Sequence, residues 1–143
     1  MGKNYLFLRL VLGSICLGHL FVGLLALISG QKALRLGSQI YGANFTPSGQ
    51  FEYIIRPLGV YMLALAVLQG VALSDPQRYK VVIDATLVVF VLRQFQRFWY
   101  VRTIRTTFGI PARAHWSGSL FYLVMATLLL IGRLTLEADS GRS

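Results

Sequence analysis

Four long apolar stretches, separated by shorter polar segments, form the main pattern of this sequence. They occupy residues 5–28, 53–73, 81–101 and 115–134. A helix needs about 20 apolar residues to cross a hydrocarbon layer of about 30 Å, so each stretch is long enough to do so. The pattern predicts an all-α fold: an integral membrane four-helix bundle with up-down topology. This single domain covers residues 1–143 and ends in a polar tail at 135–143.

The connections between these stretches differ in length. Residues 31–50 form the longest one, and its glycines and proline argue against a long helix there. The connection at residues 74–80 is short, which predicts that the second and third spans form an antiparallel hairpin. Residues 102–114 connect the third span to the fourth, with a turn expected at Gly109 and Pro111.

The basic residues of the connections indicate an orientation. Four spans put both termini on one side of the membrane, the terminal side, and residues 31–50 and 102–114 on the other, the loop side. The loop-side connections carry Lys32, Arg35, Arg102, Arg105 and Arg113, one basic residue more than the terminal side. Because basic loops favour the cytoplasm, we expect these two loops to be cytoplasmic, in a bacterial inner membrane.

Composition agrees with a membrane protein and excludes some other classes. The chain is 55% hydrophobic and 13% charged, with a mean hydropathy of +0.61. Its net charge of +9 would suit nucleic acid, but the basic residues flank apolar spans, so no nucleic-acid partner is expected. Cys16 is the only cysteine, which excludes an intramolecular disulfide.

Charges inside the third span are its least expected feature. Arg93 lies about 18 Å along the helix from Val81, and an unpaired Arg at such a depth costs about 2.5–3.5 kcal/mol. Two interpretations stay open: the side chains of Arg93 and Arg97 extend to lipid headgroups, or they meet an internal anion or partner. The candidate contact residues for an anion, a lipid or a partner are Arg56, Arg93, Arg97, Arg113 and His115. Asp84 is expected to pair with Arg9 or Arg133.

Two pairs of small residues predict close helix contacts. Ser14 with Gly18, and Ala66 with Gly70, have the four-residue spacing that lets helices approach each other. We expect these two faces to bind a protein partner or a second copy of the chain.

Cofactor and catalytic signatures are missing from the sequence. His19 and His115 lie at different depths, so we do not expect them to ligate one haem together, although either could be a single axial ligand of a haem or a chlorophyll-type pigment. A histidine that packs between helices is the favoured interpretation of each. No metal-ligand spacing or catalytic motif occurs, so we predict no cofactor, no metal and no enzymatic activity.

The second span resembles part of a known group. Glu52-x-x-x-Arg56-x-x-Gly59-Val-Tyr61, followed by an apolar run and a short turn, is similar to the second helix of small bacterial four-helix membrane families, the DoxX-like and BphX-like group. The layout is also similar to the sterol-pathway scaffold family of the endoplasmic reticulum. The resemblance implies a four-helix bundle and an accessory role beside redox or lipid enzymes. Only Arg56 and Gly59 carry over, and no catalytic residue comes with them.

Two main functions remain for the sequence. The first is a non-catalytic accessory or scaffold subunit of a larger membrane complex, which could be redox, photosynthetic or part of a lipid pathway. The second is a carrier or binding protein for an anionic amphiphile, held in an Arg-rich pocket on the loop side. A membrane enzyme is the third alternative.

Overall fold

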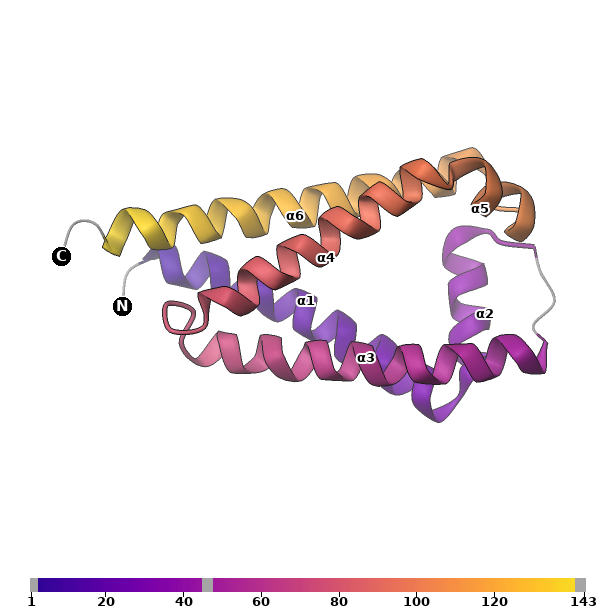
Figure 1. The fold of residues 1–143 in the computed structure, drawn as a ribbon, viewed down its shortest axis with the longest axis horizontal. Helices are drawn as coiled ribbons and strands as arrows, with labels where there is room; N and C mark the ends of the chain where they lie inside the picture. Colours follow the sequence, from indigo (N-terminus) through magenta and orange to yellow (C-terminus); the bar gives the residue numbers. More distant parts are fainter. Residues whose placement is uncertain (1–2, 45–47, 141–143) are drawn as a thin grey trace.

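The structure is a computed structural model that describes residues 3–44 and 48–140, and all regular structure in these ranges is helical. The helices are α1 (Lys3–Ile28), α2 (Gly30–Tyr41), α3 (Gly49–Ser74), α4 (Lys80–Trp99), α5 (Val101–Phe108) and α6 (Ala112–Ser140). Figure 1 shows α1, α3, α4 and α6 running along the long axis of the molecule, with α2 and α5 at one end. The predicted all-α class is confirmed.

Three of these helices, α1, α3 and α6, are long and apolar enough to cross a membrane. Helix α4 does not meet the same standard, because its 20 residues include Lys80, Asp84, Arg93 and Arg97. The expectation of a membrane protein with transmembrane helices is therefore supported by three helices, and a fourth crossing by α4 stays a prediction.

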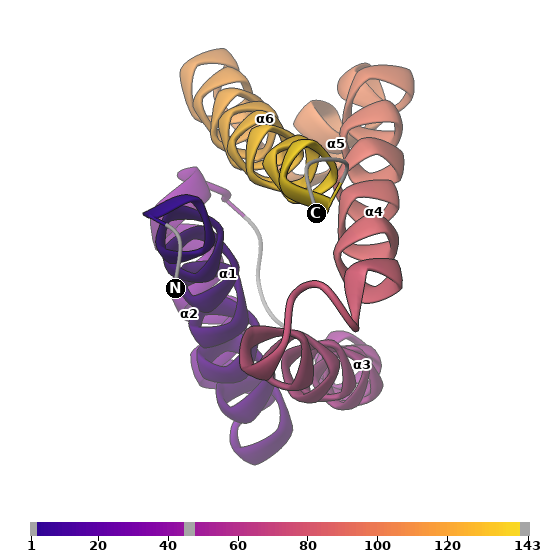
Figure 2. The ribbon, with the colours of Figure 1, turned by 90° about the vertical axis from the view of Figure 1, so that its left-hand side faces the viewer.

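The four long helices surround a common axis. Seen along that axis, α1, α3, α4 and α6 follow one another around the centre (Figure 2). The first residues of α1 and the last turns of α6 lie at the same end, and α2 and α5 lie at the other (Figure 1). These two ends correspond to the terminal side and the loop side of the sequence analysis.

The terminal side holds the apolar core. Leu8 and Leu12 of α1, Ile83 of α4 and Leu129 of α6 are fully buried there. Gly132 makes this packing possible, since a Cβ added to it would lie only 2.8 Å from Leu8 Cδ1. Helices α1 and α6 therefore touch on the terminal side, and they diverge toward the loop side (Figure 1).

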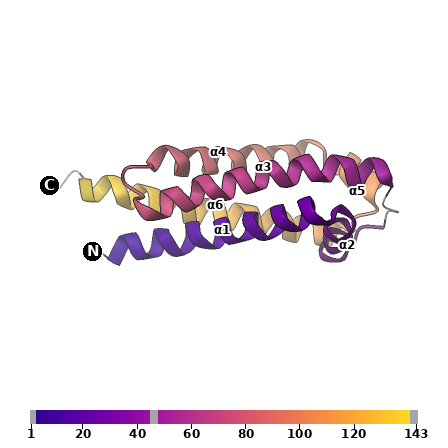
Figure 3. The same cartoon turned by 90° about the horizontal axis from the view of Figure 1, so that it is seen from below.

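The segment at residues 31–50, where glycines and a proline argue against a long helix, is not irregular throughout. It contains helix α2, which Ser29 caps at its start by accepting a hydrogen bond from the Lys32 amide. Gly42 ends the helix in the left-handed conformation at φ 59°, where a glycine is least strained. Gly42, one of the glycines expected to interrupt a helix, therefore ends α2 after 12 residues. Figure 3 shows α2 end-on, with its axis crossing those of α1 and α3.

Other predicted boundaries shift by a few residues. Helix α3 begins at Gly49, after the cap by Ser48, so Pro57 lies inside the helix and not in its first turn. The third span ends at Trp99 and a separate short helix, α5, follows. The polar tail begins as the last turns of α6, which continue to Ser140; residues 141–143 lie outside the described residues.

Candidate functional site

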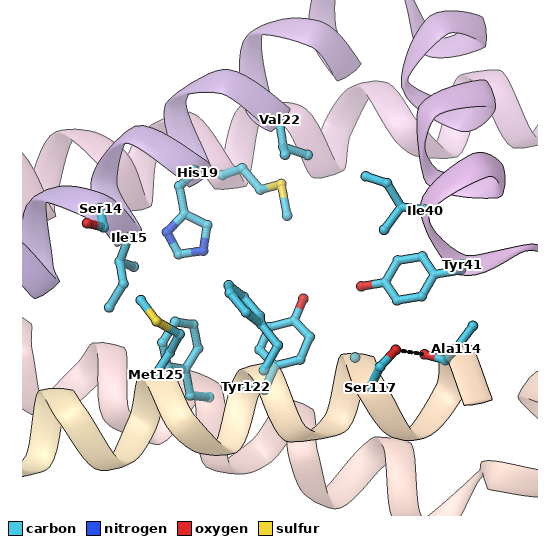
Figure 4. Close-up of a pocket in the computed structure, with 15 residues that line it drawn as sticks. Ser14, Ile15, His19, Val22, Ile40, Tyr41, Ala114, Ser117, Tyr122 and Met125 are labelled. Carbon is cyan, nitrogen blue, oxygen red and sulfur yellow. Dashed lines mark hydrogen bonds between the residues drawn. The ribbon is translucent and has the colours of Figure 1, made fainter. Parts of the chain in front are cut away.

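A cavity of about 530 Å³ lies inside the loop-side half of the bundle. Five helices contribute to its wall, and the wall contains no acidic residue, lysine or arginine. The lining residues are Ser14, Ile15, Gly18, His19, Val22, Ile40, Tyr41, Met62, Phe90, Ala114, Ser117, Gly118, Phe121, Tyr122 and Met125 (Figure 4). A pocket of 300–1,000 Å³ with an apolar wall and a few polar groups is typical of small-molecule sites.

The cavity opens to the outside between α1 and α6. Its lining residues on this side, Gly18 and Val22 of α1 with Ser117 and Phe121 of α6, are exposed on the surface of the protein. A Cβ added to Gly18 would meet nothing within 4 Å, so the face of α1 at Gly18 has no packing neighbour. The opening lies along the sides of two helices that are apolar enough to cross a membrane.

Phe90 of α4 forms the inner wall between two polar aromatic residues. Its ring centroid lies 6.3 Å from that of His19 and 5.8 Å from that of Tyr122, in an edge-to-face arrangement with the tyrosine. Phe90 is buried and belongs to the apolar core. Phe90 therefore connects the rings of His19 and Tyr122 to the apolar core.

A chain of hydrogen bonds fixes the His19 ring. His19 Nδ1 lies 2.9 Å from Gln69 Oε1 of α3, and Gln69 Nε2 donates to Thr86 Oγ1 of α4 over 3.3 Å. Thr86 donates its own hydroxyl proton to the Val82 carbonyl at 2.8 Å. Gln69 and Thr86 are both buried. The chain connects three helices and satisfies two polar side chains in an apolar interior.

Two tyrosines form the loop-side end of the cavity, and a buried arginine lies behind them. The hydroxyl groups of Tyr41 and Tyr122 both point into the cavity (Figure 4). Burial raises the pKa of Tyr41 above its ordinary value, and the neighbouring Tyr122 adds to this rise. Tyr41 is therefore a neutral hydroxyl at physiological pH, able to donate a hydrogen bond.

Arg97 lies behind these tyrosines and is only 6% exposed. Its Nε donates to Ser119 Oγ at 3.0 Å, and its Nη2 donates to the His115 carbonyl at 2.6 Å. The guanidinium carbon is 5.5 Å from the centre of the Tyr41 ring and 5.9 Å from that of Tyr122. No carboxylate of the described residues forms a salt bridge with it. The charge is thus held by neutral oxygens and aromatic faces.

The other predicted contact residues do not join Arg97 at one site. Arg93 is exposed and donates to Gln96 Oε1 at 2.7 Å, and Arg56 is exposed and pairs with Glu52 at 3.0 Å. Arg113 is exposed as well, whereas His115 is fully buried with no partner for either ring nitrogen. None of these residues lines the cavity. The structure thus does not gather these side chains around the cavity, and an anion, lipid or partner contact by them stays a prediction.

Asp84 lies on the terminal side against Arg133. Arg133 Nε donates to Asp84 Oδ1 at 2.7 Å and Nη2 to Oδ2 at 3.3 Å, a two-point contact between α6 and α4. Arg133 also pairs with Glu137 at 2.9 Å. Arg9, the other expected partner, instead donates to the Ser74 carbonyl at 3.0 Å.

The two small-residue faces have different surroundings. Ala66 is buried against α1, where its carbonyl accepts from Cys16 Sγ at 3.2 Å. Ser14 and Gly18 do not pack on another helix and instead line the mouth of the cavity. Of the two faces, only that of Ala66 and Gly70 on α3 packs against another helix of the same chain.

Sequence reasoning missed most of the polar chain behind the cavity. His19 was considered only as a packing residue or an axial ligand, and Gln69, Thr86 and Tyr122 were not singled out. One signal was available: beyond Arg56, Gln69 is the only strongly polar side chain in residues 53–73. A strongly polar residue inside an apolar span indicates a function or an internal partner.

Comparison with protein-family models, curated proteins and solved structures gave no match. The resemblance to the DoxX-like and BphX-like group therefore stays a prediction. Among residues 3–44 and 48–140, no group of three or more metal-ligating side chains could hold a metal ion.

Proposed function

We propose that this chain is a non-catalytic integral membrane protein that binds a small neutral amphiphile. In this proposal α1, α3, α4 and α6 cross the bilayer as an up-down bundle, and the ligand enters the cavity from lipid, between α1 and α6. The single observation that carries the proposal is the uncharged cavity of about 530 Å³ with its mouth on the side of two apolar helices.

The contacts of the charged residues support a crossing by α4. Asp84 is half exposed but pairs with Arg133, and Arg97 is covered by α6 and α2, so neither charge would face hydrocarbon without a partner or a cover. Arg93 remains on the outer face near the loop side, where its long side chain can extend to the headgroups. The cost of placing α4 in a bilayer is therefore lower than its composition indicates.

A neutral ligand fits the cavity better than an anionic one. The expected cationic contacts of an anion, Arg56, Arg93 and Arg113, are exposed and do not line the cavity. Arg97 does not line it either, and it donates its hydrogen bonds to Ser119 Oγ and the His115 carbonyl. An anion in the cavity would thus lose its hydration without gaining a direct charged partner.

Retention of lipid-like molecules by the purified protein tests this proposal. Gly18→Phe should fill the mouth of the cavity without disturbing helix packing, because nothing lies within 4 Å of an added Cβ. Leu17→Phe is the matched control, since Leu17 is 65% exposed on the same helix and outside the cavity. After purification in mild detergent, mass spectrometry of solvent extracts should find an amphiphile with the wild type and Leu17→Phe, and much less with Gly18→Phe. Equal retention by all three would contradict the proposal.

An accessory role in a larger membrane complex is the second candidate. Its support is the face at Ser14 and Gly18, which is open to a helix from outside the chain. The same Gly18→Phe variant would then release a co-purifying protein and not a small molecule. Purification of a single monodisperse chain, with no partner, would count against this role.

A further inference from the structure

We propose that His19 Nε2 accepts a hydrogen bond from the hydroxyl group of a long-chain alcohol bound in the cavity. This inference rests on the proposed function and adds the chemical class of the ligand. It starts from the hydrogen bonds that connect His19, Gln69 and Thr86, because these determine which ring nitrogen carries the proton.

Thr86 determines which group donates and which accepts in each of these hydrogen bonds. Thr86 has one hydroxyl proton, and it goes to the Val82 carbonyl at 2.8 Å. Toward Gln69, the Thr86 oxygen can therefore only accept, so the NH₂ group of the amide must face it. The amide oxygen of Gln69 then faces His19, and it can only accept.

The same logic assigns the tautomer of His19. Nδ1 lies 2.9 Å from an oxygen that cannot donate, so Nδ1 must carry the proton. In the neutral ring, Nε2 is then left with a lone pair and no proton. No group of the described residues hydrogen-bonds to Nε2. The ring lies on the wall of the cavity, so this acceptor is available to a ligand (Figure 4).

The tyrosine hydroxyls of the cavity wall favour an alcohol over other polar head groups of a ligand. An alcohol can give its proton to Nε2, and its oxygen can accept from Tyr41 or Tyr122, whose hydroxyls point into the same space (Figure 4). A carboxylate has no proton to give. An ammonium group would lie near Arg97 without any acidic residue on the cavity wall. Of these three groups, only the neutral hydroxyl meets both kinds of partner without an unbalanced charge.

The apolar wall sets the size of the rest of the ligand. At about 30 Å³ for each water-sized group, a volume of about 530 Å³ has room for roughly 17 such groups. Ile15, Val22, Met62 and Met125 provide apolar surface around this space. A single alkyl or isoprenoid chain would fill the cavity and continue into lipid through the mouth.

Binding of three probes to the full chain in phosphatidylcholine nanodiscs tests the inference. The probes are radiolabelled 1-tetradecanol, its methyl ether, and tetradecanoic acid at pH 8, each measured against protein-free nanodiscs. The ether matches the alcohol in chain length and lacks the donor. We expect the wild type to bind the alcohol about tenfold more tightly than the ether, the size of one lost hydrogen bond in a closed site.

Two variants locate the preference. His19→Leu should bring the ratio of alcohol to ether affinity close to one. Met62→Leu changes an apolar residue of the same cavity and should keep the tenfold preference. The wild-type comparison of alcohol with ether does not depend on either variant folding.

The outcomes separate this inference from the proposed function. Equal binding of alcohol and ether, both above the protein-free level, would overturn the role of His19 and leave a neutral-amphiphile site. No binding of either above that level would overturn both. Tighter binding of the acid than of the alcohol would show an anion site instead. A Soret absorption band in the purified protein, lost in His19→Leu, would show that Nε2 ligates a haem and would also overturn the inference.

Discussion

Gly59 of α3 lies directly against the backbone of α1 at Gly23. A Cβ added to Gly59 would come within 2.9 Å of the Gly23 carbonyl oxygen and 3.0 Å of the Leu27 amide nitrogen. The contact is reciprocal, because a Cβ on Gly23 would lie 3.0 Å from the Gly59 carbonyl oxygen. The two glycines thus allow the backbones of α1 and α3 to approach closely, as small residues do between membrane helices.

Substitution of Gly59 by Ala should therefore destabilise the protein. Backbone atoms cannot move aside as the end of a side chain can, so we expect a loss of about 1–3 kcal/mol in the free energy of unfolding. Gly37→Ala is the control: nothing lies within 4 Å of its added Cβ, and alanine favours a helix by up to about 1 kcal/mol. Unfolding in mixed micelles measures both. A Gly59→Ala protein as stable as the wild type would show that α1 and α3 lie further apart.

Removal of the charge of Asp84 should lower stability in detergent. Asp84→Asn leaves the guanidinium of Arg133, whose side chain is 12% exposed, without its two-point partner. Glu137 still contacts Arg133, and the Asp84 side chain is half exposed, so the expected loss is about 1–2 kcal/mol. Glu52→Gln, which removes the more exposed pair with Arg56, should change the melting temperature much less. Similar shifts for the two variants would argue against a special role of the α4–α6 pair.

The two arginines of α4 should respond differently to replacement by glutamine. Arg97→Gln removes hydrogen bonds to Ser119 and the His115 carbonyl inside the protein, at an expected cost of about 1–3 kcal/mol. Arg93→Gln removes only an exposed contact with Gln96 and should stay within about 0.5 kcal/mol of the wild type. Thermal unfolding of the two single variants distinguishes them. If Arg93→Gln were the more damaging change, the charge important for folding would be the outer one.

Ionisation of Tyr41 should occur above the ordinary range for tyrosine. Burial and Tyr122 raise its pKa in the folded protein, so the folded state holds this proton more tightly than the unfolded state. The stabilisation linked to it is complete below pH 10 and decreases as the pH rises through the raised pKa. The difference in absorbance at about 295 nm between the wild type and Tyr41→Phe reports this titration. A difference that appears below pH 10 would contradict a buried hydroxyl.

Both termini should lie on the same side of the membrane. Reporter fusions after the C-terminus and in the turn at residues 42–44 should give opposite signals, with the cytoplasmic signal at residues 42–44. The expectation follows from four crossings, of which α4 is the one with the most charge. Identical signals at the two sites would show an even number of spans between them and exclude a crossing by α4.

The sequence was sufficient to predict the all-helical class, because long apolar runs have one stable form in a membrane. Helix α2 was missed since its length of 12 residues depends on a cap at Ser29 and on packing of Leu34, neither of which hydropathy reveals. Gly37 breaks helices in isolation, yet here it is tolerated inside α2. Tertiary contacts therefore overrode local preference.

The site was harder to predict than the fold. Spacing along α4 correctly puts Arg93 and Arg97 one turn apart, but it cannot tell which of the two faces α6. That choice depends on the rotation of the helix, which the structure fixes through Ser119 and the His115 carbonyl. The cavity itself comes from the divergence of α1 and α6 beyond Gly132, a property of paired helices that no single segment encodes.

The chain of hydrogen bonds from His19 to Thr86 has a consequence for biosynthesis. Its members enter the membrane at different times, because α1 and α3 are synthesised before α4. Until Thr86 arrives, the NH₂ group of Gln69 has no acceptor in this chain, and an unmet donor in hydrocarbon is costly. We therefore expect this amide to be satisfied only once α4 has been synthesised, and a rotation of α3 by one residue would leave the same donor unmet in the finished protein. Because lipid packs against one apolar helix face about as well as another, the Gln69 amide is one of the contacts that favour a single rotation of α3 in the assembled bundle.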